Sequence, residues 1–237
     1  MPLKIGSRFV GEVLVVTCRG RIVAGDEAAR FHDHLNRAMQ ETPLVIVDLA
    51  EVVFVDSSGI GTLVRQMTHA RSRGGDLKLC GVPEFVTKTL RMTALDTVFE
   101  IHASQPEAVA AYYGSRRSRR EESPSSQTIL CVHESGDVLA FLRELLRRAG
   151  YGVLTTRMMT DAKILAKAAQ PQLVMLGQRT ERGENAGQLL GKIAPTIPVV
   201  LLEDDFSIAD PGVAGVALLD KVQRALSASQ RSTSARP

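Results

Sequence analysis

Aromatic residues are scarce in this chain and tryptophan is absent, since aromatic side chains make up only 4% of the 237 residues. The hydrophobic core must therefore be built mainly from aliphatic side chains. Long apolar runs are missing too, because no run approaches the roughly 20 residues that a membrane-spanning helix needs. No basic segment followed by an apolar one opens the chain, as it would in a secretory leader. We expect a soluble cytoplasmic protein that does not contact a membrane.

An excess of charge of one sign is also lacking. The net charge is +3, and neither half concentrates basic side chains as nucleic-acid-binding domains do. Cysteines are few, and Cys18, Cys80 and Cys131 each lie within an apolar segment. This placement indicates buried reduced thiols rather than disulfides or metal ligands. The length suits two domains, each with its own core.

The most informative stretch joins an apolar strand to a helix through a polar turn. Residues 44–49 form a short run rich in β-branched side chains, as expected for a strand covered on both faces. After Asp56 the apolar residues follow a helical period until Gly74 and Gly75 end it. The apolar face consists of Ile60, Leu63, Val64, Met67 and Ala70.

Asp56 is the best candidate for the helix N-cap, because Val55 and Ile60 then have the spacing of a hydrophobic staple. Ser57 becomes the first helical residue, with its hydroxyl directed outward. A phosphate there would meet unpaired N–H groups and the positive end of the helix dipole. It would also add about 1.5–2 negative charges. The turn can thus work as a switch, although its spacing equally suits ordinary helix capping.

Two enzyme motifs are excluded at this turn. A nucleophile elbow needs Gly-x-Ser-x-Gly, but Asp56 stands two residues before Ser58, and Val55 two before Ser57. A dinucleotide-binding loop needs a third glycine where the chain has Val64. We therefore expect neither an enzyme nor a bound cofactor.

The run from Val55 to Gly61, Val-Asp-Ser-Ser-Gly-Ile-Gly, resembles the signature of the STAS domain of bacterial anti-sigma factor antagonists. The resemblance covers about residues 5–112, including the strand at 77–80. It implies that Ser57 is phosphorylated by an anti-sigma factor kinase and dephosphorylated by a serine phosphatase. It also implies a mixed sheet with helices mainly on one side, within a domain of residues 1–113. Further contacts with the partner are expected from Asp56, Ser58, Gly59, Gly61 and Thr62.

One position departs from this family. Its members often have Gly-x-Leu-Asp after the second strand, and Val23 stands here where that aspartate would be. Asp26 and Glu27 could supply the charge instead. The alternative is a scaffold or small-ligand-binding module in which Ser57 only begins a helix.

On the predicted helix that starts at Asp26, His32 and His34 face apart, and we expect both at the surface.

Residues 114–126 contain four arginines and no apolar residue, which predicts a flexible linker. Strands and helices then alternate again over residues 127–226. The pattern predicts a doubly wound parallel sheet of five βα units, including a helix near 186–193 and a fifth strand at 216–219. Residues 227–237 are predicted to be a disordered tail.

This second half resembles a response-regulator receiver domain without its chemistry. His133 and Glu134 stand where the family has an acidic pair, and Gly177 stands in place of the phosphate-accepting aspartate, whereas Lys221 matches the family lysine. We expect this half to dock another signalling protein without phosphotransfer. Glu134 could gather a cation together with Glu203, Asp204 and Asp205, but acidic residues in such loops are usually solvated, so no metal is expected.

Overall fold

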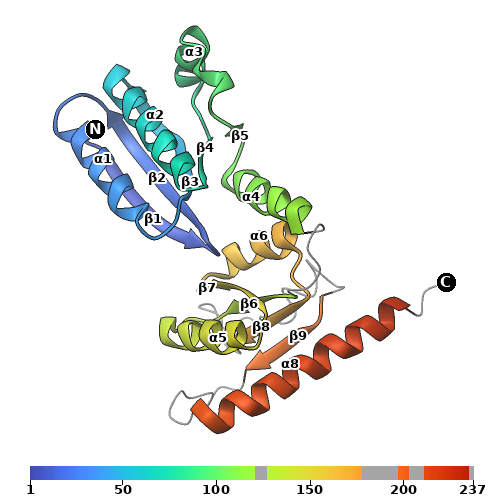
Figure 1. The fold of residues 1–237 in the computed structure, drawn as a ribbon. Coiled ribbons are helices and arrows are strands. Elements are labelled where there is room, and N and C mark those ends of the chain that lie inside the picture. The colour runs from blue at the N-terminus through green and yellow to red at the C-terminus, as the bar shows by residue number, and fades with distance from the viewer. Residues whose placement is uncertain (121–126, 178–196, 203–210, 235–237) are drawn as a thin grey trace. The chain divides into compact units, whose positions relative to one another are not determined.

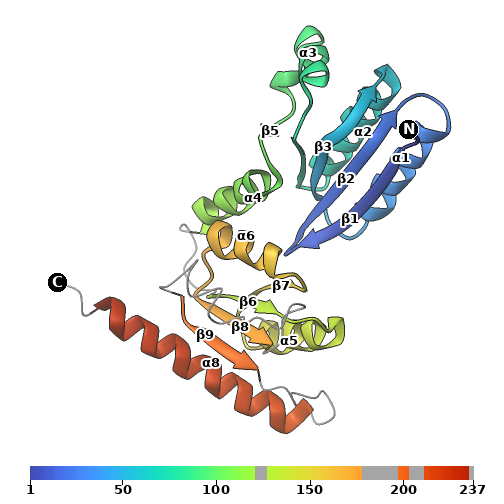
Figure 2. The same ribbon diagram turned by 180° about the vertical axis from the view of Figure 1, so that it is seen from behind.

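The computed structural model describes residues 1–120, 127–177, 197–202 and 211–234. The chain divides into two compact units, Met1–Tyr112 and Tyr113–Pro237, shown in Figures 1 and 2. The strands are β1 (Lys4–Val10), β2 (Val13–Ile22), β3 (Leu44–Val55), β4 (Asp76–Cys80), β5 (Ile101–His102), β6 (Thr128–Val132), β7 (Gly152–Thr156), β8 (Leu173–Gly177) and β9 (Val199–Leu202). The helices are α1 (Asp26–Ala38), α2 (Ser57–Ser72), α3 (Glu84–Met92), α4 (Gln105–Arg120), α5 (Gly136–Arg148), α6 (Met159–Ala169) and α8 (Pro211–Ser234), with a 3-10 turn at Leu95–Thr97.

The first unit contains a mixed sheet with the strand order β1-β2-β3-β4-β5. β1 pairs with β2 in antiparallel fashion, and the other neighbours are parallel, which confirms the predicted mixed sheet. β3 is longer than the predicted strand, because it continues beyond residue 49 to Val55. Register shifts between β2 and β3 allow Val52 and Val55, three residues apart, both to join the core.

Helices α1 and α2 lie side by side on one face of this sheet (Figure 1). The predicted apolar face of α2 is confirmed, because Leu63 and Met67 are buried in one core with the sheet. Phe31 and Leu35 of α1 are buried in the same core. Val86 and Leu90 of α3 join the same core. The largest hydrophobic contribution to the stability of this unit therefore comes from the face that carries the start of α2.

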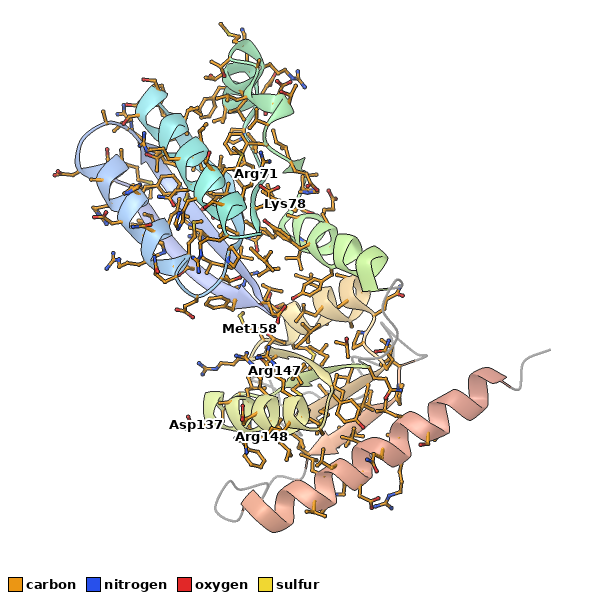
Figure 3. The ribbon with its side chains drawn as sticks, in the orientation of Figure 1. Arg71, Lys78, Asp137, Arg147, Arg148 and Met158 are labelled. Carbon is orange, nitrogen blue, oxygen red and sulfur yellow. The ribbon has the colours of Figure 1, made fainter. Side chains whose placement is uncertain are left out.

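Helix α4 contacts the opposite face. The hydroxyl of Tyr112 lies 2.9 Å from the carbonyl oxygen of Val45, and the side-chain amide of Gln105 donates to the Asp48 carboxylate. The buried ammonium of Lys78, labelled in Figure 3, lies 4.7 Å from the ring centre of Tyr112 and pairs with Glu100. These polar contacts hold α4 against the face of the sheet that lies opposite α1 and α2.

The structure differs from the predicted linker, because α4 continues through residues 114–120 to Arg120. Arginine is a good helix former and serine does not prevent helix formation, and the first proline after residue 114 is Pro124. A polar composition was therefore a poor guide to the backbone here.

The second unit contains a parallel sheet with the order β7-β6-β8-β9 among its described strands. Its core joins this sheet to α5, through residues such as Leu142 and Leu146, and to α8. The predicted helix near 186–193 lies outside the described residues.

Two predictions fail at α8. Residues 216–219 belong to this helix instead of forming a fifth strand, because Leu218, Val222 and Leu226 bury one face at helical spacing. The helix also continues to Ser234, through most of the predicted tail at 227–237. No helix in the described part of the chain is long and apolar enough to cross a bilayer.

Candidate functional site

The start of α2 is fixed by the carboxylate of Asp56, which confirms this residue as the N-cap. Its Oδ1 accepts the N–H of Gly59 at 2.9 Å, and its Oδ2 accepts the N–H of Ala24 at 2.7 Å. The N–H of Asp56 donates to the carbonyl oxygen of Ile22 at 3.1 Å. Asp56 therefore joins α2 to the segment that follows β2.

The pKa of the Asp56 carboxyl lies below its ordinary value. The main cause is the hydrogen bond from the N–H of Gly59, and the N–H groups of Ala24 and Ser58 act in the same direction against the effect of burial. The predicted staple is also present, because Val55 and Ile60 are buried in the same core. The cap and the staple together give this turn a defined backbone.

Ser57 is the first residue of α2 and is exposed. In the part of the chain that the structure describes, its hydroxyl makes no hydrogen bond. Because the neighbouring backbone is held by the cap, the hydroxyl is presented from a rigid support. The position thus presents an accessible hydroxyl at the protein surface.

The other residues expected to meet a partner divide into two groups. Asp56, Ser58 and Gly61 are partly exposed, whereas Gly59 and Thr62 are buried. A Cβ atom on Gly59 would lie 2.7 Å from a methyl of Val55 and 2.9 Å from the carbonyl oxygen of Ile22. Gly59 and Thr62 therefore support the turn but leave no side chain at the surface for a partner.

The segment containing Val23 lies directly against this turn, since its neighbours Ile22 and Ala24 both hydrogen bond to Asp56. Val23 is half-buried, and its carbonyl oxygen accepts the N–H of Ala28. The position where the family resemblance fails is thus close to Ser57 in space. Nearby Asp26 is exposed at the start of α1.

Two features of this region were not predicted from the sequence. Phe54 precedes the turn with 43% of its surface exposed, and the guanidinium of Arg21 lies over its ring at 5.4 Å. Arg65 donates to the Thr62 hydroxyl at 2.9 Å, and a Cβ on Gly61 would lie 3.5 Å from Nη1 of Arg65. The position of the Arg65 side chain could have been suspected from sequence, because Ser57, Gly61 and Arg65 follow one another at intervals of four residues.

The prediction for the histidines of α1 is corrected, because His32 and His34 are both half-buried. Each flanks the buried stripe of α1 centred on Phe31. His32 Nδ1 lies 2.9 Å from the side-chain nitrogen of Gln66 on α2. Burial, followed by the charge of Arg37, lowers the pKa of His34.

In the second unit, the imidazole of His133 covers Gly177. A Cβ on this glycine would lie 2.7 Å from Cδ2 of His133, and Nδ1 of His133 accepts the N–H of Ser135 at 3.0 Å. The match of Lys221 to the receiver lysine is wrong, because Lys221 lies within α8 and not after a strand. Glu134 is exposed, and the other acidic residues considered with it, 203–205, lie outside the described residues.

Replacing Asp56 by alanine is expected to lower the free energy of unfolding of the first unit by about 1–2 kcal/mol, because the cap is lost. Asp56→Asn should retain part of this free energy, since asparagine keeps one carbonyl acceptor of the two oxygens used here. Urea unfolding followed by circular dichroism measures both variants. Equal stability of Asp56→Ala and the wild type would contradict the assigned cap.

The stability difference between the wild type and Asp56→Ala is expected to depend on pH. Since folding lowers the pKa of Asp56, the stabilisation is complete above its unfolded pKa of about 4 and is lost as the pH falls through the folded pKa. The stability difference between the wild type and Asp56→Ala should therefore be full at pH 7 and shrink below about pH 4. A constant difference down to about pH 2 would exclude this linkage.

Comparison with known proteins assigns the first unit. Residues 4–108 match the STAS domain family model, so this part of the chain is a STAS domain. An anti-sigma factor antagonist from Mycobacterium paratuberculosis is 19% identical, and the match covers 46% of this chain and 92% of that one with a TM-score of 0.42. The anti-sigma factor antagonist SpoIIAA in its unphosphorylated form is 16% identical, with 49% and 98% covered and a TM-score of 0.37. The phosphorylated form of SpoIIAA from Bacillus is 18% identical, with 46% and 99% covered and a TM-score of 0.39.

Proposed function

We propose that this chain is an anti-sigma factor antagonist that acts by partner switching and is controlled by phosphorylation of Ser57. In this proposal the unphosphorylated start of α2 binds an anti-sigma factor kinase and thereby frees a sigma factor. The observation that carries the proposal is the exposed, unbonded hydroxyl of Ser57 at the rigid start of α2 in a STAS domain.

The chemistry of the switch is a phosphoryl transfer supplied by the kinase. The Ser57 oxygen forms a bond to the γ-phosphorus of ATP, the bond between that phosphorus and the β–γ bridging oxygen breaks, and ADP leaves while the hydroxyl proton is released. The product carries about 1.5–2 additional negative charges at the contact surface. A serine phosphatase then hydrolyses the phosphate ester and restores the hydroxyl. The chain itself acts as a substrate and a binding partner, and we propose no catalytic activity for it.

The exposed residues beside Ser57 supply the remaining contact surface in this proposal. Phe54 and Val53 are 43% and 61% exposed on the strand that leads into the turn, and Arg21 lies over the Phe54 ring. Exposed aromatic and arginine side chains are enriched where proteins bind one another. A charged phosphate introduced three residues after Phe54 would have to be desolvated on binding, which weakens the contact.

For the second unit we propose a receiver-like docking module without phosphotransfer. The parallel order β7-β6-β8-β9 is compatible with such a module. Gly177 offers no carboxylate, and the His133 ring fills the space where a side chain at residue 177 would begin. This unit would therefore bind a signalling protein in a way that does not depend on an aspartyl phosphate.

The affinity of the full chain for its anti-sigma factor kinase, measured by calorimetry, tests the main proposal. Ser57→Asp should weaken binding at least about tenfold, because it places a charge in the contact. Ser7→Asp is the matched control, since Ser7 is an exposed serine on β1, and it should leave the affinity unchanged. Binding that is indifferent to Ser57→Asp would overturn the switch and favour the alternative, a STAS scaffold or small-ligand-binding module.

A further inference from the structure

We propose that Arg65 pairs with the phosphate on Ser57 and holds it against the surface of α2. This inference rests on the proposed phosphorylation of Ser57 and adds the residue that receives the new charge. Ser57, Gly61 and Arg65 are spaced by four residues each along α2. Residues at this spacing lie one above another on the same side of a helix.

The space between Arg65 and Ser57 is open because the intervening residue is a glycine. Nη1 of Arg65 lies 3.5 Å from the position that a Cβ on Gly61 would take. The guanidinium therefore already covers the helix one turn before its own Cα, in the direction that long helical side chains favour. Four residues, about 6 Å of rise, remain between Gly61 and Ser57, and an ion-pair contact itself spans up to about 4 Å.

The N-cap occupies one of the usual partners of a phosphate at a helix start. The carboxylate of Asp56 already accepts the N–H of Gly59, so this N–H cannot turn to a phosphate without breaking the cap. Asp56 is also ionised and repels a second anion beside it. The charge of Asp56 and the occupied N–H of Gly59 therefore favour a phosphate position farther along α2, toward Arg65.

The present partner of Arg65 is easily replaced. Nη2 of Arg65 donates to the hydroxyl of Thr62, a neutral acceptor, at 2.9 Å, whereas a phosphate would give a charge-assisted bond roughly twice as strong. Thr62 keeps its own bond to the carbonyl oxygen of Ser58 at 3.1 Å. Exchange of the acceptor thus costs little and leaves the helix intact.

Other charged groups near the turn act more weakly or in the opposite sense. Asp26 and Glu27 in the first turn of α1 are acidic and oppose the phosphate. Arg21 is basic, but its guanidinium already lies over the ring of Phe54. Arg65 is the basic residue on the same side of α2 as Ser57. Its removal should therefore change the pKa of the phosphate more than removal of the other charged groups.

The test uses the full chain with phosphoserine inserted at position 57 during translation, so that no kinase is needed. The second pKa of the phosphate, ordinarily about 6, is read by phosphorus NMR during a pH titration. Arg65→Gln should raise this pKa by about half a unit, because a nearby cation favours the dianion. Arg65→Lys, which keeps the charge, should stay close to the wild type.

Arg91→Gln is the matched control, since Arg91 is an exposed arginine on α3 and its loss changes the net charge equally. Equal phosphate pKa values in Arg65→Gln, Arg91→Gln and the wild type would overturn the pairing. Because the phosphate is built in, failure of a kinase to modify Ser57 would count against the proposed function and not against this pairing. Arg65 is exposed, so circular dichroism should show that its variants fold.

Discussion

Replacing Ser57 by alanine is expected to reduce phosphate uptake from the anti-sigma factor kinase to the background level. The reason is local, because Ser57 is the exposed serine at the start of α2, whereas the Thr62 hydroxyl is buried and donates to the carbonyl oxygen of Ser58. The measurement is transfer of labelled phosphate from ATP to the full chain, with the site located by mass spectrometry.

Ser58→Ala is the matched control for this experiment. Ser58 is adjacent in sequence but only half-exposed, and the variant should accept phosphate to the same final extent as the wild type. If Ser57→Ala accepts phosphate as readily as the wild type, the assignment of Ser57 is wrong. Loss of uptake in Ser58→Ala alone would move the acceptor to the second serine.

Replacing Gly59 and Gly61 by alanine is expected to change the stability of the first unit in opposite directions. Gly59→Ala should destabilise the first unit by about 2–3 kcal/mol, since its Cβ would lie 2.7–2.9 Å from Val55 and Ile22, in one case from a backbone oxygen that cannot move freely. Gly61→Ala should stabilise α2 by up to about 1 kcal/mol, because its closest neighbour is the end of the Arg65 side chain at 3.5 Å.

Urea unfolding of both variants beside the wild type measures this difference. Hydrogen exchange of the α2 amides assigns the change to the correct unit. The same free energy of unfolding for Gly59→Ala and Gly61→Ala would show that α2 does not pack closely against β2 and β3 at this turn. Such a result would also remove the rigid support assumed for Ser57.

The start of α2 could be predicted from sequence because several local signals agree there. The apolar period, the capping aspartate and the staple of Val55 and Ile60 all place the first helical residue at Ser57, and the structure has it there. The strength of the Asp56 cap was not predictable. Its second hydrogen bond comes from Ala24, thirty-two residues earlier in the chain, and only tertiary structure brings that group close.

The prediction for α8 failed because a short apolar run is ambiguous. Residues 216–219 suit a strand when they are considered alone, and only the burial of Val222 and Leu226 reveals the helical period. Arg65 was missed for a different reason. Its spacing from Ser57 was visible, but the direction of its side chain over Gly61 depends on the fold.

The exposed pair of Phe54 and Arg21 also required the structure. Phe54 lies beyond the strand predicted at residues 44–49, and no motif in the sequence singles out Arg21. The register of β2 against β3 places them opposite each other, and a shift of one residue would have turned one of them into the core. Sequence reasoning thus placed Ser57 at the start of α2 but did not find the exposed pair beside it.

The most direct test of the partner switch is the affinity of one kinase for the full chain before phosphorylation, after phosphorylation and after treatment with a serine phosphatase. The account predicts tight binding, then a loss of at least about tenfold that follows the occupancy of phosphate on Ser57, and then full recovery. Equal affinity in all three states, with Ser57 shown to carry the phosphate in the second, would contradict the account.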